Sequence, residues 1–215
     1  MTPVYLDLSI PAGEMKPGSS RFWGKPDMPC GMRYPSYKDS SGEEHPYFFV
    51  CQINLADVSV YDVGNMLPHK GVLSFFARID HYLGYYDTDD FIGGSVSGPD
   101  AVKVLYFPPD ANLAETGSPS ESRPAYIPRA LQISFSHSPA SPFGGHALFA
   151  PPTHRQWETW DPPFEDNIIL LEIDSFSGDG FDLRFMDEGV LDLLVSPSDL
   201  GRHCFSDVRA IVLSS

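Results

Sequence analysis

Two groups of side chains combine residue types that bind ligands or move protons. The first joins two aromatic rings to three carboxylates: Tyr85, Tyr86, Asp87, Asp89 and Asp90. Alternate carboxylates resemble the start of a calcium-binding loop, but Phe91 and Gly98 stand where such a loop needs an oxygen ligand and a glutamate. We therefore predict a solvated acidic loop without a metal, and we take these five residues as a candidate recognition patch.

The second group consists of four polar side chains at the ends of two strand-like runs: Gln52, Asn54, Glu172 and Asp174. Each pair flanks one isoleucine, and because the side chains of a strand alternate between its faces, the members of a pair share a face. Paired carboxyls share protons in acid–base catalysis, although only the second pair supplies carboxyls. The other interpretation is hydrogen bonding to an adjacent loop.

The motifs predict no catalytic residue, no cofactor and no metal. Residues 93–98 break the GxSxG spacing of a nucleophile elbow, and residues 178–180 lack the third glycine of a dinucleotide-binding loop. The seven histidines form no HxH, HxxxH or HExxH pattern of the kind that zinc sites use. Cys51 lies in an apolar run and is expected in the core. A catalytic cysteine needs a general base and a group that orients this base, and the sequence identifies neither for Cys204.

The charge balance favours a basic partner. Asp and Glu number 29 against 14 Lys and Arg, which gives a formal net charge of −15. The basic residues are scattered, whereas binding to a phosphate backbone needs them clustered, so we expect no nucleic-acid partner. An anionic membrane surface would repel the chain for the same reason. A basic protein is the partner that this charge would steer.

The sequence predicts a cytoplasmic protein. The N-terminal residues lack the positive start and apolar block of a signal peptide, and the longest apolar runs, such as residues 168–171, are too short to cross a bilayer. The three cysteines are an odd number without CxxC spacing, which fits a reducing compartment better than a disulfide scaffold. The oligomeric state stays open.

Short strands must position these side chains. The 21 prolines and 18 glycines interrupt helices and favour strands joined by turns. Six runs have the apolar or alternating pattern of strands: residues 47–55, 71–77, 102–107, 131–135, 168–173 and 190–195. Helical patterns are few and short: residues 55–61, 111–115 and 196–201. We predict a mainly β fold, of the β-rich α+β type.

An internal repeat is the expected plan of this fold. Three landmarks recur with offsets of 121, 120 and 118 residues: Gly24 and Gly145, Ile53 and Ile173, and Gly71 and Gly189. Repeats of about residues 20–80 and 140–200 would each leave one sheet face to cover, so we expect them to pack as a roll or sandwich. Residues 1–215 would then form a single domain, with the four polar groups in equivalent places of the two repeats.

Motifs of these segments carry a family resemblance. In order they are WGKPDMP at 23–29, VCQINL at 50–55, LPHKGVLSFF at 67–76, GG at 144–145 and LLEIDS at 170–175. Together they resemble the YwqG-like family, which is mostly bacterial. Trp23 replaces the first glycine of the opening pair, Glu172 replaces a second Gln and FMD at 185–187 replaces a more usual WGD, which indicates a divergent member. The resemblance implies a mainly β, cytoplasmic protein of uncharacterised activity.

Two functions are compatible with the sequence. The leading hypothesis is a non-enzymatic binding or interaction module with an acidic surface, for example an antidote to a basic toxin. The alternative is a small-molecule hydrolase with a site of carboxylates and histidine between the two halves. A deep pocket with converging polar groups would favour the enzyme, and a flat acidic face would favour the binding module.

Overall fold

The structure is mainly β, which confirms the predicted fold class. It is a computed structural model that describes residues 1–79, 92–117, 129–139, 145–152, 166–178, 181–185 and 188–213. Within these ranges the chain forms short strands and two helices of about one turn, α1 (Leu55–Val58) and α2 (Pro197–Gly201). Neither of these described helices has the length and apolar character needed to cross a membrane.

Ten strands form one antiparallel sheet in the order β16-β15-β12-β11-β1-β10-β2-β6-β7-β8. Their bounds in chain order are β1 (Val4–Ser9), β2 (Arg21–Phe22), β6 (Phe48–Asn54), β7 (Val72–Ala77), β8 (Val102–Phe107), β10 (Leu131–Ser136), β11 (Ala147–Leu148), β12 (Ile168–Asp174), β15 (Val190–Val195) and β16 (Arg209–Leu213). The other strands pair two by two: β3 (Asp27–Pro29) with β9 (Leu113–Glu115), β4 (Ser36–Lys38) with β5 (Glu44–Pro46), and β13 (Phe176–Gly178) with β14 (Phe181–Leu183).

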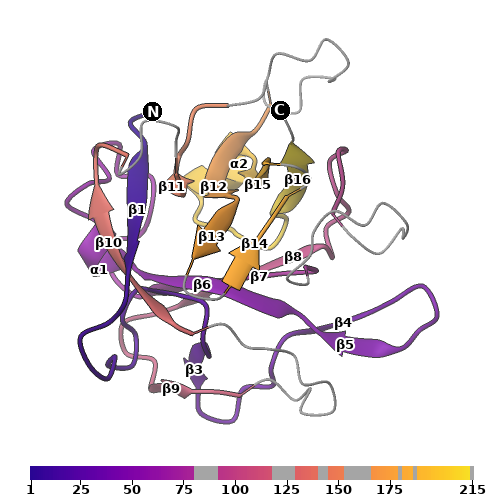
Figure 1. The fold of residues 1–215 in the computed structure, drawn as a ribbon, viewed down its shortest axis with the longest axis horizontal. Helices are drawn as coiled ribbons and strands as arrows, with labels where there is room; N and C mark the ends of the chain where they lie inside the picture. The colour runs from indigo at the N-terminus through magenta and orange to yellow at the C-terminus, as the bar shows by residue number, and fades with distance from the viewer. Residues whose placement is uncertain are drawn as a thin grey trace.

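The ten-stranded sheet curls until it nearly closes. Figure 1 shows its two end strands, β16 and β8, on the same side of the molecule. The outer edge of β16 is paired with the segment that leads into β8. The backbone N–H of Ser97 donates to the carbonyl of Ala210 at 2.8 Å, and that of Val212 donates to the carbonyl of Gly93 at 2.9 Å. This edge is therefore covered by the chain's own backbone.

The strand order is symmetrical about the β1–β10 pair. Outwards from β1 follow β11, β12, β15 and β16, and outwards from β10 follow β2, β6, β7 and β8. The registers match as well, since Arg21 lies opposite Gln52 and Ala147 lies opposite Glu172. Both β6 and β12 carry a register shift after their second residue. The two sets of five strands are equivalent in order and register, and their origin as an internal repeat stays a prediction.

One landmark of the predicted repeat is placed wrongly. The sequence pattern matched Gly24 with Gly145. In the structure, β2 and β11 are the equivalent strands. If the alignment of these two strands is continued along the chain, Trp23 corresponds to Phe149 and Gly24 corresponds to Ala150. Trp23 and Phe149 also share a left-handed backbone, with φ of 58° and 55°. β2 and β11 contain two residues each, so their sequence pattern is too short to fix this alignment.

Two of the three predicted helical turns form. Residues 55–61 contain α1 and residues 196–201 contain α2. The helical turn predicted at residues 111–115 is wrong, because Leu113–Glu115 pairs with Asp27–Pro29 as a strand. A five-residue pattern has a weak preference, and here pairing with a distant strand overrides it.

The ten-stranded sheet buries apolar side chains on both faces. One face contributes the main core, with fully buried residues such as Phe22, Ile53 and Leu171. The other face carries two separate clusters, one over β6, β7 and β8 and one over β12, β15 and β16. Strands buried on both faces read as continuous apolar runs. Polar residues within them are buried too: Gln52, Ser74, Glu172 and Asp192.

Candidate functional site

The polar residue Gln52, predicted as a candidate on β6, belongs to a buried network. Its Nε2 donates to Oδ2 of Asp27 at 2.7 Å, and its Oε1 accepts from the backbone N–H of Asp27 at 2.8 Å. Nε2 also donates to the carbonyl of Ser19 at 2.9 Å. These bonds use both amide donors and the carbonyl oxygen, so Gln52 holds β6 to the segment that leads into β3.

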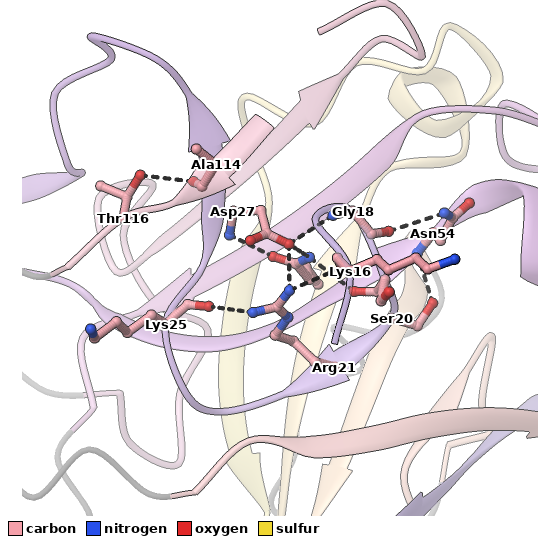
Figure 2. Close-up of polar contacts among 11 residues, drawn as sticks. Lys16, Gly18, Ser20, Arg21, Lys25, Asp27, Asn54, Ala114 and Thr116 are labelled. Atoms are coloured by element: carbon pink, nitrogen blue, oxygen red, sulfur yellow. Dashed lines mark hydrogen bonds and ion pairs between the residues drawn. The ribbon is translucent and has the colours of Figure 1, made fainter. Parts of the chain in front are cut away.

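A buried ion pair forms the centre of this network. Nη2 of Arg21 donates to Oδ2 of Asp27 at 2.5 Å, and neither side chain is more than 4% exposed. The same oxygen accepts from the backbone N–H of Gly18, and Arg21 also donates to the carbonyls of Lys25 and Lys16. Figure 2 shows Gly18 and Arg21 converging on Asp27, and the carbonyl of Lys25 next to the guanidinium of Arg21. A buried charge pair needs such additional hydrogen bonds, so the network fixes β2, β3 and β6 relative to one another.

Sequence reasoning missed Arg21 and Asp27. Arg21 lies in a strand of two residues, and Asp27 follows Pro26 in a stretch typical of a turn. The available signal was one pair of opposite charges close in sequence among apolar residues such as Phe22 and Met28. Only the pairing of β2 with β6 places that pair against Gln52.

Asn54, the second candidate on β6, joins three segments. Its Oδ1 accepts from the backbone N–H of Ala56 at 3.0 Å and thereby caps α1. Its Nδ2 donates to the carbonyl of Gly18 at 3.0 Å, and its backbone N–H donates to Oγ of Ser20 at 2.9 Å. Both candidates on β6 therefore form hydrogen bonds to neighbouring segments.

Replacing Asn54 with alanine should lower the free energy of unfolding by about 1–2 kcal/mol, because it removes a helix cap and the donor to the carbonyl of Gly18. Urea denaturation followed by circular dichroism measures the change. Asn112→Ala is the control, since Asn112 is exposed and its side-chain amide has one long contact, at 3.9 Å, to Sγ of Cys30. Equal losses in the two variants would contradict the capping role of Asn54.

On the equivalent strand β12, Glu172 faces Asp192 of β15, and we call these two residues the carboxyl pair. They lie directly opposite each other and are 5% and 0% exposed. Burial, and next the negative charge of Glu172, raise the pKa of Asp192 well above its usual range. Neither oxygen of Asp192 has a hydrogen-bond donor among the described residues. Their contact with Glu172 becomes a hydrogen bond only when one of the two carboxyls carries a proton.

Asp174 and His146 lie at neighbouring strand ends. The backbone N–H of Asp174 donates to Nδ1 of His146 at 3.1 Å. The ring of His146 stacks on Phe22 of the main core with centroids 4.9 Å apart, and burial lowers its pKa to about 4, so that it is neutral at pH 7. The next residue, Ala147, lies opposite Glu172 and on the other face of the sheet. The structure therefore places His146 and the carboxyl pair on opposite faces.

Three possible metal ligands, Asp39, Glu43 and His45, meet at the β4–β5 hairpin with ligand atoms within 4.8 Å of one another. Oδ1 of Asp39 accepts from the backbone N–H and the hydroxyl of Ser41, and Oδ2 lies 2.9 Å from Nε2 of His45. The bond from Ser41, followed by that from His45, holds the pKa of Asp39 well below its usual range. An aspartate that binds its own turn in this way stabilises the hairpin, and we assign these residues to that role.

The candidate recognition patch lies outside the described residues: Tyr85, Tyr86, Asp87, Asp89 and Asp90. It stays a prediction. Of the four predicted polar groups, Gln52 and Asn54 both form hydrogen bonds to residues 18–27, and Glu172 and Asp174 lie two residues apart on β12. The partner of Glu172 across the sheet is Asp192, which the sequence did not single out.

Comparison with known proteins gives a family. Residues 20–134 match the family described as Domain of unknown function (DUF1963). This segment starts at Ser20 and ends within β10, so it contains the three side chains of the network, Arg21, Asp27 and Gln52. No curated protein matches the sequence. Because the match covers more than half of the 215 residues, the chain belongs to the DUF1963 family.

Proposed function

We propose that the protein is a non-enzymatic binding module whose acidic surface takes a basic protein as its partner. The supporting observation is the net charge of −15, together with the exposure of most of the described carboxylates. Among the described residues, the buried carboxylates are Asp27, Asp62, Glu172 and Asp192. All other carboxylates whose burial is described are partly or fully exposed. At the surface their charge creates the potential that steers a basic partner.

Two of the buried carboxylates, Asp27 and Asp62, have structural partners, and the exposed carboxylates are the ones that a partner protein can reach. Asp27 is paired with Arg21, and Oδ2 of Asp62 accepts from the backbone N–H of Leu67 at 2.8 Å. The chain has 29 acidic and 14 basic residues, so carboxylates without a basic partner would remain even if every Lys and Arg paired with one carboxylate. A basic partner would neutralise this excess on binding.

We further propose that the protein is a YwqG-like member and works in the cytoplasm. The motifs at β6, β7 and β12 support the first point. All three cysteines are free thiols, with Cys30 exposed, Cys51 buried and Cys204 partly buried, which supports a reducing compartment. An antidote to a basic toxin is one protein of this kind, because it binds its target through opposite charge.

The alternative, a small-molecule hydrolase with carboxylates and histidine between the halves, has less support. Its chemistry needs a histidine within hydrogen-bond reach of a carboxylate in a site that substrate can enter. His146 and the carboxyl pair lie on opposite faces, and all three side chains are at most 5% exposed. The geometry of the described residues therefore favours the binding module.

Affinity capture from the native lysate tests the proposed partner. At low salt the tagged protein should recover a saturable partner with an isoelectric point well above neutral. Binding should weaken as salt rises, because exposed charges are screened beyond about 8 Å at physiological ionic strength. Recovery of neutral or acidic proteins alone would overturn the proposal.

The recognition patch has its own matched test. Two triple variants remove the same charge from different places: D87N/D89N/D90N and E14Q/D110N/D166N. The first should weaken binding of the captured partner about tenfold, which corresponds to about 1.4 kcal/mol. The second changes exposed carboxylates elsewhere and should have a smaller effect, measured by titration calorimetry. Equal weakening would assign binding to the overall charge and would rule out the patch as the contact.

A further inference from the structure

The carboxyl pair occupies positions that are uncharged in the equivalent strands. The register of β6 and β7 places Gln52 opposite Ser74, as the register of β12 and β15 places Glu172 opposite Asp192. Residues directly opposite in an antiparallel pair lie on the same face. An amide and a hydroxyl in one set of strands thus correspond to two acids in the other.

The strands next to these positions, β2 and β11, also differ: the first set has a charged residue where the second set has an apolar one. Arg21 of β2 lies opposite Gln52 and supplies the cation that balances Asp27. The equivalent residue of β11, opposite Glu172, is Ala147. The second set of strands therefore combines two facing carboxyls with a methyl group where the first set has a guanidinium.

The described residues of the sheet face around Asp192 are mostly apolar. Ile211 of β16 lies directly opposite Asp192. Arg209 of β16 forms an ion pair with Asp207 at 2.8 Å, and its Nη1 donates to the carbonyl of Ser97. The cluster on this face consists of Ala147, Ala150, Ile169, Val190, Leu194, Ile211 and Leu213, with Tyr5 packed against it. The other titratable groups described on the adjoining elements are Tyr5 and Asp7 on β1, His146 before β11, Asp174 at the end of β12 and Glu188 before β15.

An ionised Asp192 opposite Glu172 is unfavourable in these surroundings. Facing residues of antiparallel strands have Cβ atoms about 4.5–5.5 Å apart, and like charges at that spacing repel strongly where water is excluded. Ionised Asp192 would also keep two buried acceptors without a donor among the described residues. One proton removes both costs, because a protonated carboxyl donates its O–H to the other carboxylate.

We propose that Glu172 and Asp192 form a proton-binding site, in which the folded protein holds one proton from the solvent between the two carboxyls at neutral pH. In the unfolded chain both carboxyls are hydrated and ionised at neutral pH. Folding therefore takes up a proton at this site, and the stability of the fold depends on pH through it.

The sign of this dependence follows from the two pKa values involved. The pKa of Asp192 is raised well above 3.8, so from about pH 4 upwards the native state binds more protons than the unfolded state. Stability then falls with rising pH until the pH passes the native pKa of the pair, and it levels off above that point. The pKa of His146, lowered from 6.5 to about 4, makes stability rise between those values and adds nothing further above them. Between about pH 6.5 and 8 a decrease is thus the contribution of the carboxyl pair. At higher pH, buried Cys51 and Tyr34 add a decrease of their own, because burial raises the pKa of both side chains.

Infrared spectroscopy of the folded protein at pH 7 tests the proposal. A protonated carboxyl has a C=O stretching band distinct from the bands of carboxylates, and we expect the wild type to show about one such group per chain. The double variant E172Q/D192S, which reproduces Gln52 and Ser74, should lose this band. The variant D110N, at an exposed aspartate, should keep it. A wild type without the band, or a double variant with the band unchanged, would overturn the proposal.

Proton counting on the wild type tests the proposal even if the double variant does not fold. Unfolding the wild type with urea in a weakly buffered solution at pH 7 should release about one proton per chain, detected with an indicator dye. The folded double variant should release close to none. A wild type that releases no proton would overturn the proposal, whether or not the double variant folds.

Discussion

Replacing Arg21 with alanine should lower the free energy of unfolding by about 3–5 kcal/mol, the usual range for removing one partner of a buried ion pair. Asp27 would stay buried at 1% exposure with its charge unbalanced. The carbonyls of Lys16 and Lys25 would also lose the donor that the guanidinium supplies. Urea denaturation followed by circular dichroism measures the loss.

Arg33→Ala is the matched control for this variant. Arg33 pairs with Glu44 at the same distance of 2.5 Å, but its side chain is 79% exposed, so its removal should leave stability nearly unchanged. The double variant R21A/D27A should lose less than the sum of the two single variants, because no unbalanced charge remains. Equal losses for Arg21 and Arg33, or losses of Arg21 and Asp27 that simply add, would contradict the coupling.

The sequence predicted the fold class because the main strands are buried on one or both faces and carry the corresponding pattern. Each of the six predicted runs overlaps a strand of the ten-stranded sheet, and residues 102–107 and 190–195 coincide with β8 and β15. The strands of this sheet that were missed are very short or lie near the ends of the chain. β2 and β11 contain two residues each, and β1 and β16 lie near the chain ends, where fewer turn signals bound a run.

The candidate site could be predicted only in part because its chemistry depends on strand register. Gln52 and Glu172 stand out in the sequence as polar residues at the end of apolar runs. Asp192 interrupts an apolar run in the same way, but one sequence does not show which residue faces it. Asp174 was grouped with Glu172 by alternation, whereas the contact across the sheet joins Glu172 to Asp192. Such contacts depend on the register between strands that are distant in the sequence, and a local sequence pattern does not reveal this register.

Alanine at Gly189 should lower the free energy of unfolding by about 3 kcal/mol, and alanine at Gly71 should do so by a similar amount. A Cβ atom at Gly189 would overlap the carbonyl oxygen of Leu213 and lie 2.7 Å from that of Phe185. A Cβ atom at Gly71 would overlap the carbonyl oxygen of Phe107. Backbone oxygens cannot turn aside as flexible side chains do, so the strands themselves would have to shift. The φ of 96° at Gly71 adds strain for any other residue.

Gly13→Ala is the control, because nothing lies within 4 Å of a Cβ atom there. Its stability should change little, since alanine mainly restricts the unfolded chain. Gly71 and Gly189 directly precede the equivalent strands β7 and β15, and each approaches the carbonyl oxygen of the last residue of the adjoining strand, β8 or β16. Urea denaturation of the three variants should therefore give two similar large losses and one small change. Losses at Gly71 and Gly189 no greater than at Gly13 would contradict the close approach of these backbones, and a loss at one of them alone would contradict their equivalence.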